Sequence, residues 1–71
     1  MNFLYQIITS AYVYTLYEED EHVLLHILDL KNEETTDVFG VTKLIDILSE
    51  DPEVDFEDLI EVDDIITIVS D

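Results

Sequence analysis

Carboxylates are the only reactive side chains that this sequence concentrates. Residues 46–64 contain ten of them and no basic residue, and residues 18–21 contain four more. Carboxylate pairs can act as general acids and bases, but here they are so frequent that no pair points to a reaction. Their density is more informative, because a fixed array of negative charge attracts a cationic binding groove.

The spacing of the longer cluster can be compared with that of phosphates. If residues 46–64 are mainly helical, they span about 28 Å at a rise of about 1.5 Å per residue. That is one charge per roughly 3 Å, near the ~3.4 Å spacing along one DNA strand. Phe56 lies among these acids, where it is either a binding anchor or a core residue of a short helix. The candidate partner-binding residues are Asp46, Glu50, Asp51, Glu53, Asp55, Phe56, Glu57, Asp58, Glu61, Asp63 and Asp64, with Glu18, Glu19, Asp20 and Glu21.

The overall composition separates this chain from a disordered acidic tail. It has nineteen acidic residues, two lysines and no arginine, which gives a net charge of −17 on 71 residues. Disordered segments are poor in apolar residues, whereas 48% of this chain is hydrophobic. The acids could simply be a solvated surface that aids solubility. Ordinary protein surfaces, however, mix acidic and basic residues, and such pairs relieve the repulsion between like charges. A chain that lacks this relief indicates selection for its electrostatic field.

The sequence lacks the motifs for zinc, calcium, phosphate and nucleic-acid binding. His22 and His26 lack the glutamate of a zinc-binding H-E-x-x-H motif. The alternating acids from Asp51 resemble a calcium loop, but Phe56 and Val62 stand where that loop needs Gly and Glu. No phosphate-binding loop, cysteine or basic footprint for nucleic acid is present. We therefore expect no enzyme, no cofactor, no metal site and no direct nucleic-acid binding.

The expected fold is one α+β domain over residues 1–71, with a small antiparallel sheet of three or four strands and one or two helices packed on one face. Residues 3–17 suit strands, with a bend at Thr9-Ser10, and residues 11–30 predict a hairpin with a charged tip at residues 18–21. Residues 1–10 are open between strand and helix, and a helical interpretation of residues 23–30 remains.

The second half predicts helices and a last strand. Lys31–Thr36 is expected to be a polar loop. A helix capped by Thr36 or Asp37 would then run to Asp51-Pro52 with one apolar face, weakened by Gly40. Residues 53–61 suggest a short helix with Val54, Phe56, Leu59 and Ile60 facing inward. Residues 65–69 predict a central strand, because they are apolar on both faces.

The uncharged N-terminal stretch from Met1 to Tyr17 is not expected to be a targeting or membrane segment. It has no basic region or cleavage site, polar residues interrupt it, and it is shorter than the ~20 apolar residues of a membrane-spanning helix. We expect buried sheet in a cytoplasmic protein.

In size, charge and absence of cysteine, the whole chain resembles the small acidic DNA-mimic proteins, many of them encoded by bacteriophages. These include anti-CRISPR and anti-restriction proteins and inhibitors of nucleases and glycosylases. The resemblance involves a strategy and no alignable motif. It implies a non-enzymatic inhibitor in the host cytoplasm whose carboxylates occupy the DNA- or RNA-binding groove of a basic protein, most often a nuclease, with anti-CRISPR activity first.

Two other classes remain open from the sequence. One is an acidic adaptor or antitoxin that neutralises a basic protein unrelated to DNA, which an exposed apolar patch and weak salt dependence would indicate. The other is a self-assembling structural protein, in which residues 3–17 supply a strand edge for a homodimer. The target's identity, and the choice between blocking a groove and holding an inactive state, are also open.

Overall fold

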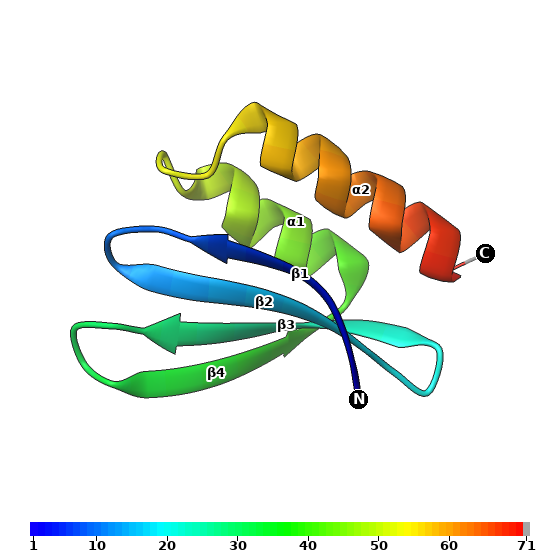
Figure 1. The fold of residues 1–71 in the computed structure, drawn as a ribbon, viewed down its shortest axis with the longest axis horizontal. Helices are drawn as coiled ribbons and strands as arrows, with labels where there is room; N and C mark the ends of the chain where they lie inside the picture. Colours follow the sequence, from blue (N-terminus) through cyan, green and yellow to red (C-terminus); the bar gives the residue numbers. More distant parts are fainter. Residues whose placement is uncertain (71) are drawn as a thin grey trace.

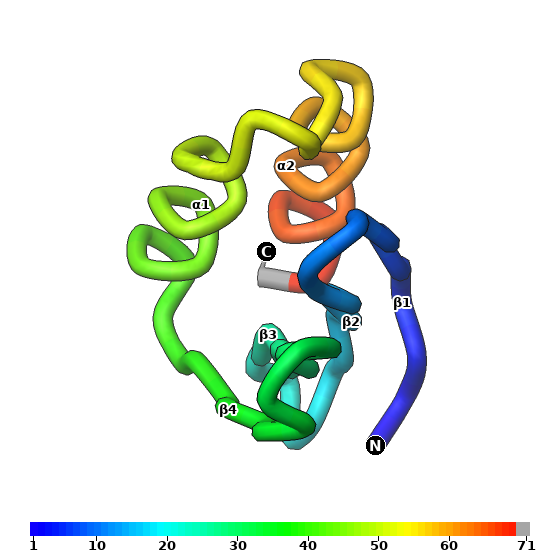
Figure 2. The backbone as a smooth tube through the Cα atoms, turned by 90° about the vertical axis from the view of Figure 1, so that its left-hand side faces the viewer, coloured from blue at the N-terminus to red at the C-terminus, as the bar shows by residue number. Residues whose placement is uncertain are grey.

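Four strands and two helices make up the computed structural model, which describes residues 1–70. Their order and bounds are β1 (Asn2–Ile8), β2 (Tyr12–Glu19), β3 (His22–Asp29), β4 (Glu34–Phe39), α1 (Val41–Glu50) and α2 (Phe56–Ser70). The strands form an antiparallel sheet in the order β1-β2-β3-β4. Both helices lie on the same side of it (Figures 1 and 2). The α+β prediction is therefore confirmed.

The first half of the chain follows its alternating pattern. Residues 1–10 contain strand β1, and β2 pairs with β3 as the expected hairpin, so the helical interpretation of residues 23–30 is wrong. At the expected bend, the Thr9 hydroxyl accepts the backbone N–H of Tyr12 at 2.9 Å and of Ala11 at 3.3 Å. These bonds close the turn between β1 and β2. Because β2 is central, only β1 supplies the edge that was expected over residues 3–17.

The predicted start of the first helix was wrong. Residues from Glu34 onward form edge strand β4 instead of a loop and a helical turn. Thr35 and Thr36 are β-branched and suit a strand, and the apolar Val38 packs against the core from the sheet. Gly40 is the N-cap residue of α1, with φ of +101°, so it costs the helix interior nothing. The helix ends at Glu50, before Pro52, as expected.

The predicted last strand was also wrong, because residues 65–69 belong to α2. In the helix, Val62 and Ile66 are buried, with Leu59 and Val69 packed beside them. This spacing of three and four residues continues one apolar face through the segment. A short apolar run fits a strand and a helix equally well when it is examined alone.

The core lies between the sheet and the helices. Leu44 and Leu48 of α1 and Val62 of α2 are almost fully buried against Leu16 and Leu25 of the central strands. Each such side chain stabilises the fold by about 1.5–3 kcal/mol. The helical residues that do not face this core are therefore free to be acidic, and they present their charge on the side of the molecule away from the sheet.

Candidate functional site

The main acidic cluster lies on two helices that fold back on each other. Asp46 and Glu50 lie on α1, the next three acids lie in the connection at residues 51–55, and the rest lie on α2. The helices run side by side in opposite directions (Figures 1 and 2). The expectation of one charged helix about 28 Å long over residues 46–64 is therefore wrong, because the chain reverses its direction at Asp51-Pro52. We call α1, the connection and α2 together the helical layer.

The outer side of α2 combines carboxylates with apolar side chains. Glu57, Glu61, Asp63 and Asp64 are all exposed. Phe56 is 75% exposed, so its interpretation as a core residue is wrong, and its interpretation as a candidate anchor remains.

Ile60 was also expected to face inward, and it is 47% exposed. It lies one turn from Phe56 on the same side of the helix. The expectation failed because the inward side of α2 follows the residues next to Val62 and Ile66, which excludes both Phe56 and Ile60. Val54 and Leu59 do pack against the core.

Three acids of the helical layer are anchored to the sheet by hydroxyl groups. The Tyr14 hydroxyl donates to Asp51 at 2.5 Å, and the Tyr5 hydroxyl donates to Asp58 at 2.7 Å. Glu53 accepts the hydroxyl of Ser10 at 2.5 Å and its backbone N–H at 3.2 Å. With almost no basic residue available, neutral donors hold these carboxylates. Asp51, Glu53 and Asp58 therefore help to dock the helices onto the sheet.

The surroundings of the two tyrosines favour the neutral, protonated form of each phenol. The hydrogen bond to Asp58, followed by partial burial and the negative charge nearby, raises the pKa of Tyr5 from its ordinary 10.0 to about 12. Burial, with the hydrogen bond to Asp51, raises the pKa of Tyr14 as well. Both phenols hold their protons more tightly in the folded protein than in an unfolded chain.

A cleft of about 650 Å³ lies between the sheet and the C-terminal end of α1. Tyr12, Ile27 and Ile47 are among its lining residues, together with acids from separate segments. The acidic residues that line it are Asp29, Glu34, Glu50, Asp51 and Glu53. Asp29 and Glu34 were not among the candidate residues, because only the β3–β4 register places them beside α1.

The acids at residues 18–21 lie elsewhere. They surround the β2–β3 turn, at the opposite end of the molecule from the α1–α2 connection (Figure 1). Asp20 and Glu21 both have positive φ, at 51° and 66°. The structure therefore does not join this cluster to the helical layer.

Both histidines lie on β3. The Nδ1 of His26 is 2.7 Å from Asp37, and this is the one contact within residues 1–70 that protonation of a histidine would make an ion pair. The described part of the chain has no group of three or more His, Cys, Asp or Glu residues arranged to hold a metal ion. None of its helices is long and apolar enough to cross a membrane.

Comparison with known proteins gives no relative from which a role could be transferred. No family model, curated protein or solved structure matches the chain. Its function therefore has to be inferred from its own residues, above all from the acids of the helical layer.

Proposed function

We propose that this protein is a non-enzymatic inhibitor that mimics nucleic acid and occupies the DNA- or RNA-binding groove of a defence nuclease in the host cytoplasm. Anti-CRISPR activity is the first candidate and anti-restriction activity the second. The observation that carries the proposal is the row of exposed carboxylates on α2, none of which has a basic partner within residues 1–70.

The spacing on α2 supports this role. From Glu57 to Asp64, four exposed acids divide seven residues of helix into three intervals. The intervals of four, two and one residues are uneven, but at about 1.5 Å per residue their mean is about 3.5 Å along the axis, close to the ~3.4 Å of phosphates along one DNA strand. A nuclease groove lined by Lys and Arg would therefore meet a mean density of negative charge similar to that of its substrate.

The turns provide separate support, because they retain negative charge where it is unfavourable. Asp20, Glu21 and Glu33 are the three non-glycine residues with positive φ in the described part of the chain, and all three are acidic. Aspartate tolerates this backbone conformation, but glycine or asparagine would fit it better than the glutamates Glu21 and Glu33. These two glutamates are consistent with selection for charge in preference to stability.

A second candidate is favoured by Phe56 and Ile60. Their exposure among the acids of α2 gives the helix an apolar contact that a pure charge mimic does not need. An adaptor or antitoxin that neutralises a basic protein unrelated to DNA would use these side chains as anchors. The two candidates differ in how the complex responds to salt and to competing DNA.

The test is a pull-down from bacterial lysate with the tagged protein, washed at low and then at high salt, followed by an activity assay on the captured enzyme. We expect a nuclease that salt releases, that DNA displaces, and whose cleavage of DNA or RNA falls as the protein is added. The variant Glu57→Gln/Glu61→Gln/Asp64→Asn should inhibit less. Capture of a protein that resists both DNA and salt would replace this proposal with the adaptor or antitoxin.

A further inference from the structure

The side of the sheet away from the helices is an apolar surface that no element of the fold covers. Alternation along the strands, with the register between them, determines which residues lie on this open face. Its exposed apolar residues are Phe3, Ile8 and Phe39, with the partly exposed Val13 and Leu28 between them and Leu24 buried beneath. Phe3 and Phe39 are each 60% exposed and Ile8 is 69% exposed. Exposed apolar patches of this kind mark interaction surfaces.

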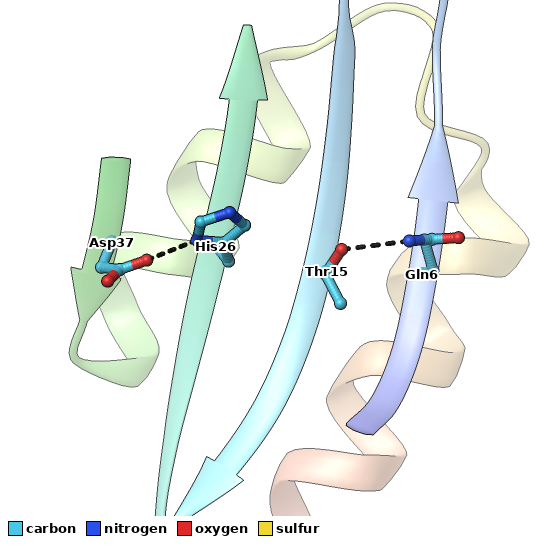
Figure 3. A network of polar contacts seen from close by, with 4 residues as sticks. All are labelled: Gln6, Thr15, His26 and Asp37. Atoms are coloured by element: carbon cyan, nitrogen blue, oxygen red, sulfur yellow. Dashed lines mark hydrogen bonds and ion pairs between the residues drawn. The ribbon is translucent and has the colours of Figure 1, made fainter. Parts of the chain in front are cut away.

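The polar groups across the centre of the open face are satisfied internally. The Gln6 side-chain amide donates to the Thr15 hydroxyl at 3.2 Å, and His26 pairs with Asp37 at 2.7 Å. Figure 3 shows these four side chains as one row across all four strands. Tyr17 packs beside the row, with its ring edge-to-face against Phe3 and His26. These two hydrogen bonds lower the cost of covering the row, because they pair polar groups of neighbouring strands with each other.

The open face also carries few acids. Only two acids of the four strands occupy its alternating positions, Glu19 and Asp37, and each lies opposite a histidine in the register, His22 and His26 respectively. The rest of the molecule is strongly acidic. A basic partner would thus be drawn to the helical layer, and the open face requires a partner surface that is itself apolar and poor in charge.

We propose that the open face binds the same face of a second copy of this chain, to give a two-fold symmetric dimer with layers in the order helix, sheet, sheet, helix. The surface that each copy offers is the surface that the other needs, as in an isologous interface. The two helical layers then lie on the outside with both sheets between them. Sheets pack about 10 Å apart, so this separation exceeds the Debye length of ~8 Å at physiological salt.

The size of the open face predicts a weak dimer. Four strands at about 4.8 Å, each about 23 Å long, give roughly 450 Å² per copy, or about 900 Å² in total. This lies at the low end for specific interfaces. Association should therefore depend on protein concentration, and it should strengthen with added salt, which screens the repulsion between two copies of charge −17. Target binding through the acids would have the opposite salt dependence. The dimer does not depend on the proposed function.

Sedimentation velocity from roughly 5 to 500 µM protein, in low and in high salt, tests the dimer. We expect the mass to rise from 8.3 kDa toward twice that value, with more dimer at high salt. Phe39→Gln should weaken the dimer at least tenfold. Phe56→Gln, the matched change on the helical layer, should leave it unchanged. Ile8→Gln repeats the test at a second exposed position if Phe39→Gln fails to fold.

Four outcomes would overturn the proposal. A monomer at the highest concentration in high salt would show that nothing of the same chain covers the open face. Equal weakening by Phe39→Gln and Phe56→Gln would locate the contact elsewhere. Growth beyond a dimer would indicate open-ended pairing through the edge of β1. Binding of a different, apolar partner to the open face, with the free protein monomeric, would also reject the second copy as the occupant.

Discussion

The helical layer and the open face lie on opposite sides of one sheet and handle charge in opposite ways. On the helical layer, exposed acids such as Glu57 and Glu61 have no basic neighbour to relieve their repulsion. On the open face, the acids Glu19 and Asp37 each lie opposite a histidine, and apolar side chains surround them. The same chain thus crowds acids together on one side, and on the other it keeps them few and places each opposite a histidine.

This difference shows that the charge is organised by the fold. Only two of the nineteen acids, Glu19 and Asp37, lie on the open face of the sheet. Most of the others lie on helices, turns and the cleft, where solvent can screen them. Those that meet the sheet, such as Asp51 and Asp58, are held by tyrosine hydroxyls. The helical layer therefore suits a charged surface, and the open face suits an apolar one.

The largest expected effect comes from removing charge on one side only. Glu57→Gln/Glu61→Gln/Asp64→Asn changes three exposed acids of α2 without touching a tyrosine bond. At roughly 0.5–1 kcal/mol per charge, target affinity should fall about ten- to a hundredfold. The fold should be equally or more stable. Calorimetry or an inhibition assay with the captured enzyme would measure the loss.

The matched control also removes three negative charges, but from the β2–β3 hairpin. It is Glu18→Gln/Glu19→Gln/Glu21→Gln. It alters net charge equally, so it should reproduce only the long-range part of the effect, which high salt removes. If both triple variants lose affinity equally at every salt concentration, the helical layer is not the contact surface. Equal losses would also end the distinction between the two acidic clusters.

The part of the fold that could be predicted from sequence is the part with a strong local pattern. The apolar runs on both sides of the charged tip at residues 18–21 identified the β2–β3 hairpin, Thr9-Ser10 marked the bend before it, and Pro52 located the end of α1. The errors at Glu34–Phe39 and at residues 65–69 have different causes. Glu34–Phe39 has only two apolar residues, so its polar sequence gives no strand pattern, and its pairing with β3 decides its structure. The apolar run at residues 65–69 fits helix and strand, and only packing against the rest of the core decides between them.

For the candidate site, the sequence identified the acids but not their roles. It could not separate the free Glu57 from Asp58, which bonds to Tyr5 fifty-three residues away. It also gave no indication that Asp29 and Glu34 line the cleft, since their position there depends on the register between β3 and β4. Such contacts are tertiary, and no local pattern in a single sequence encodes them.

The second prediction concerns the acids that face the sheet. Tyr14→Phe removes the donor to the half-buried Asp51 and should lower the free energy of unfolding by about 1–2 kcal/mol. Tyr12→Phe is the matched control, because its ring lies next to that of Tyr14 at a centroid distance of 5.7 Å. Urea unfolding would compare them. A loss no larger for Tyr14→Phe than for Tyr12→Phe would mean that the bond does not dock the helices.

The third prediction follows from the pKa of Tyr5. In the folded protein it is raised from 10.0 to about 12, so the unfolded chain releases this proton first as the pH rises. Stability from this group is complete below pH 10 and is lost between about pH 10 and pH 12. The variant Tyr5→Phe should unfold with a shallower dependence on pH in that range. An unchanged slope would show that the phenol is not held in its neutral form by Asp58.

The smallest effect is expected at the β2–β3 turn, where the fold keeps an acid in an unfavourable conformation. Glu21 has φ of 66°, and a two-residue hairpin turn with positive φ at both positions favours glycine as its second residue. Glu21→Gly should therefore raise the free energy of unfolding by about 0.5–1 kcal/mol. Thermal and urea unfolding would measure this gain, with Glu19→Gln as the control for loss of one charge nearby. If the gain in stability comes with no loss of inhibition, the hairpin acids contribute only to the general field. If inhibition falls by more than the Glu19→Gln control, the turn contacts the target directly, and the binding surface extends from the helical layer to the opposite end of the molecule.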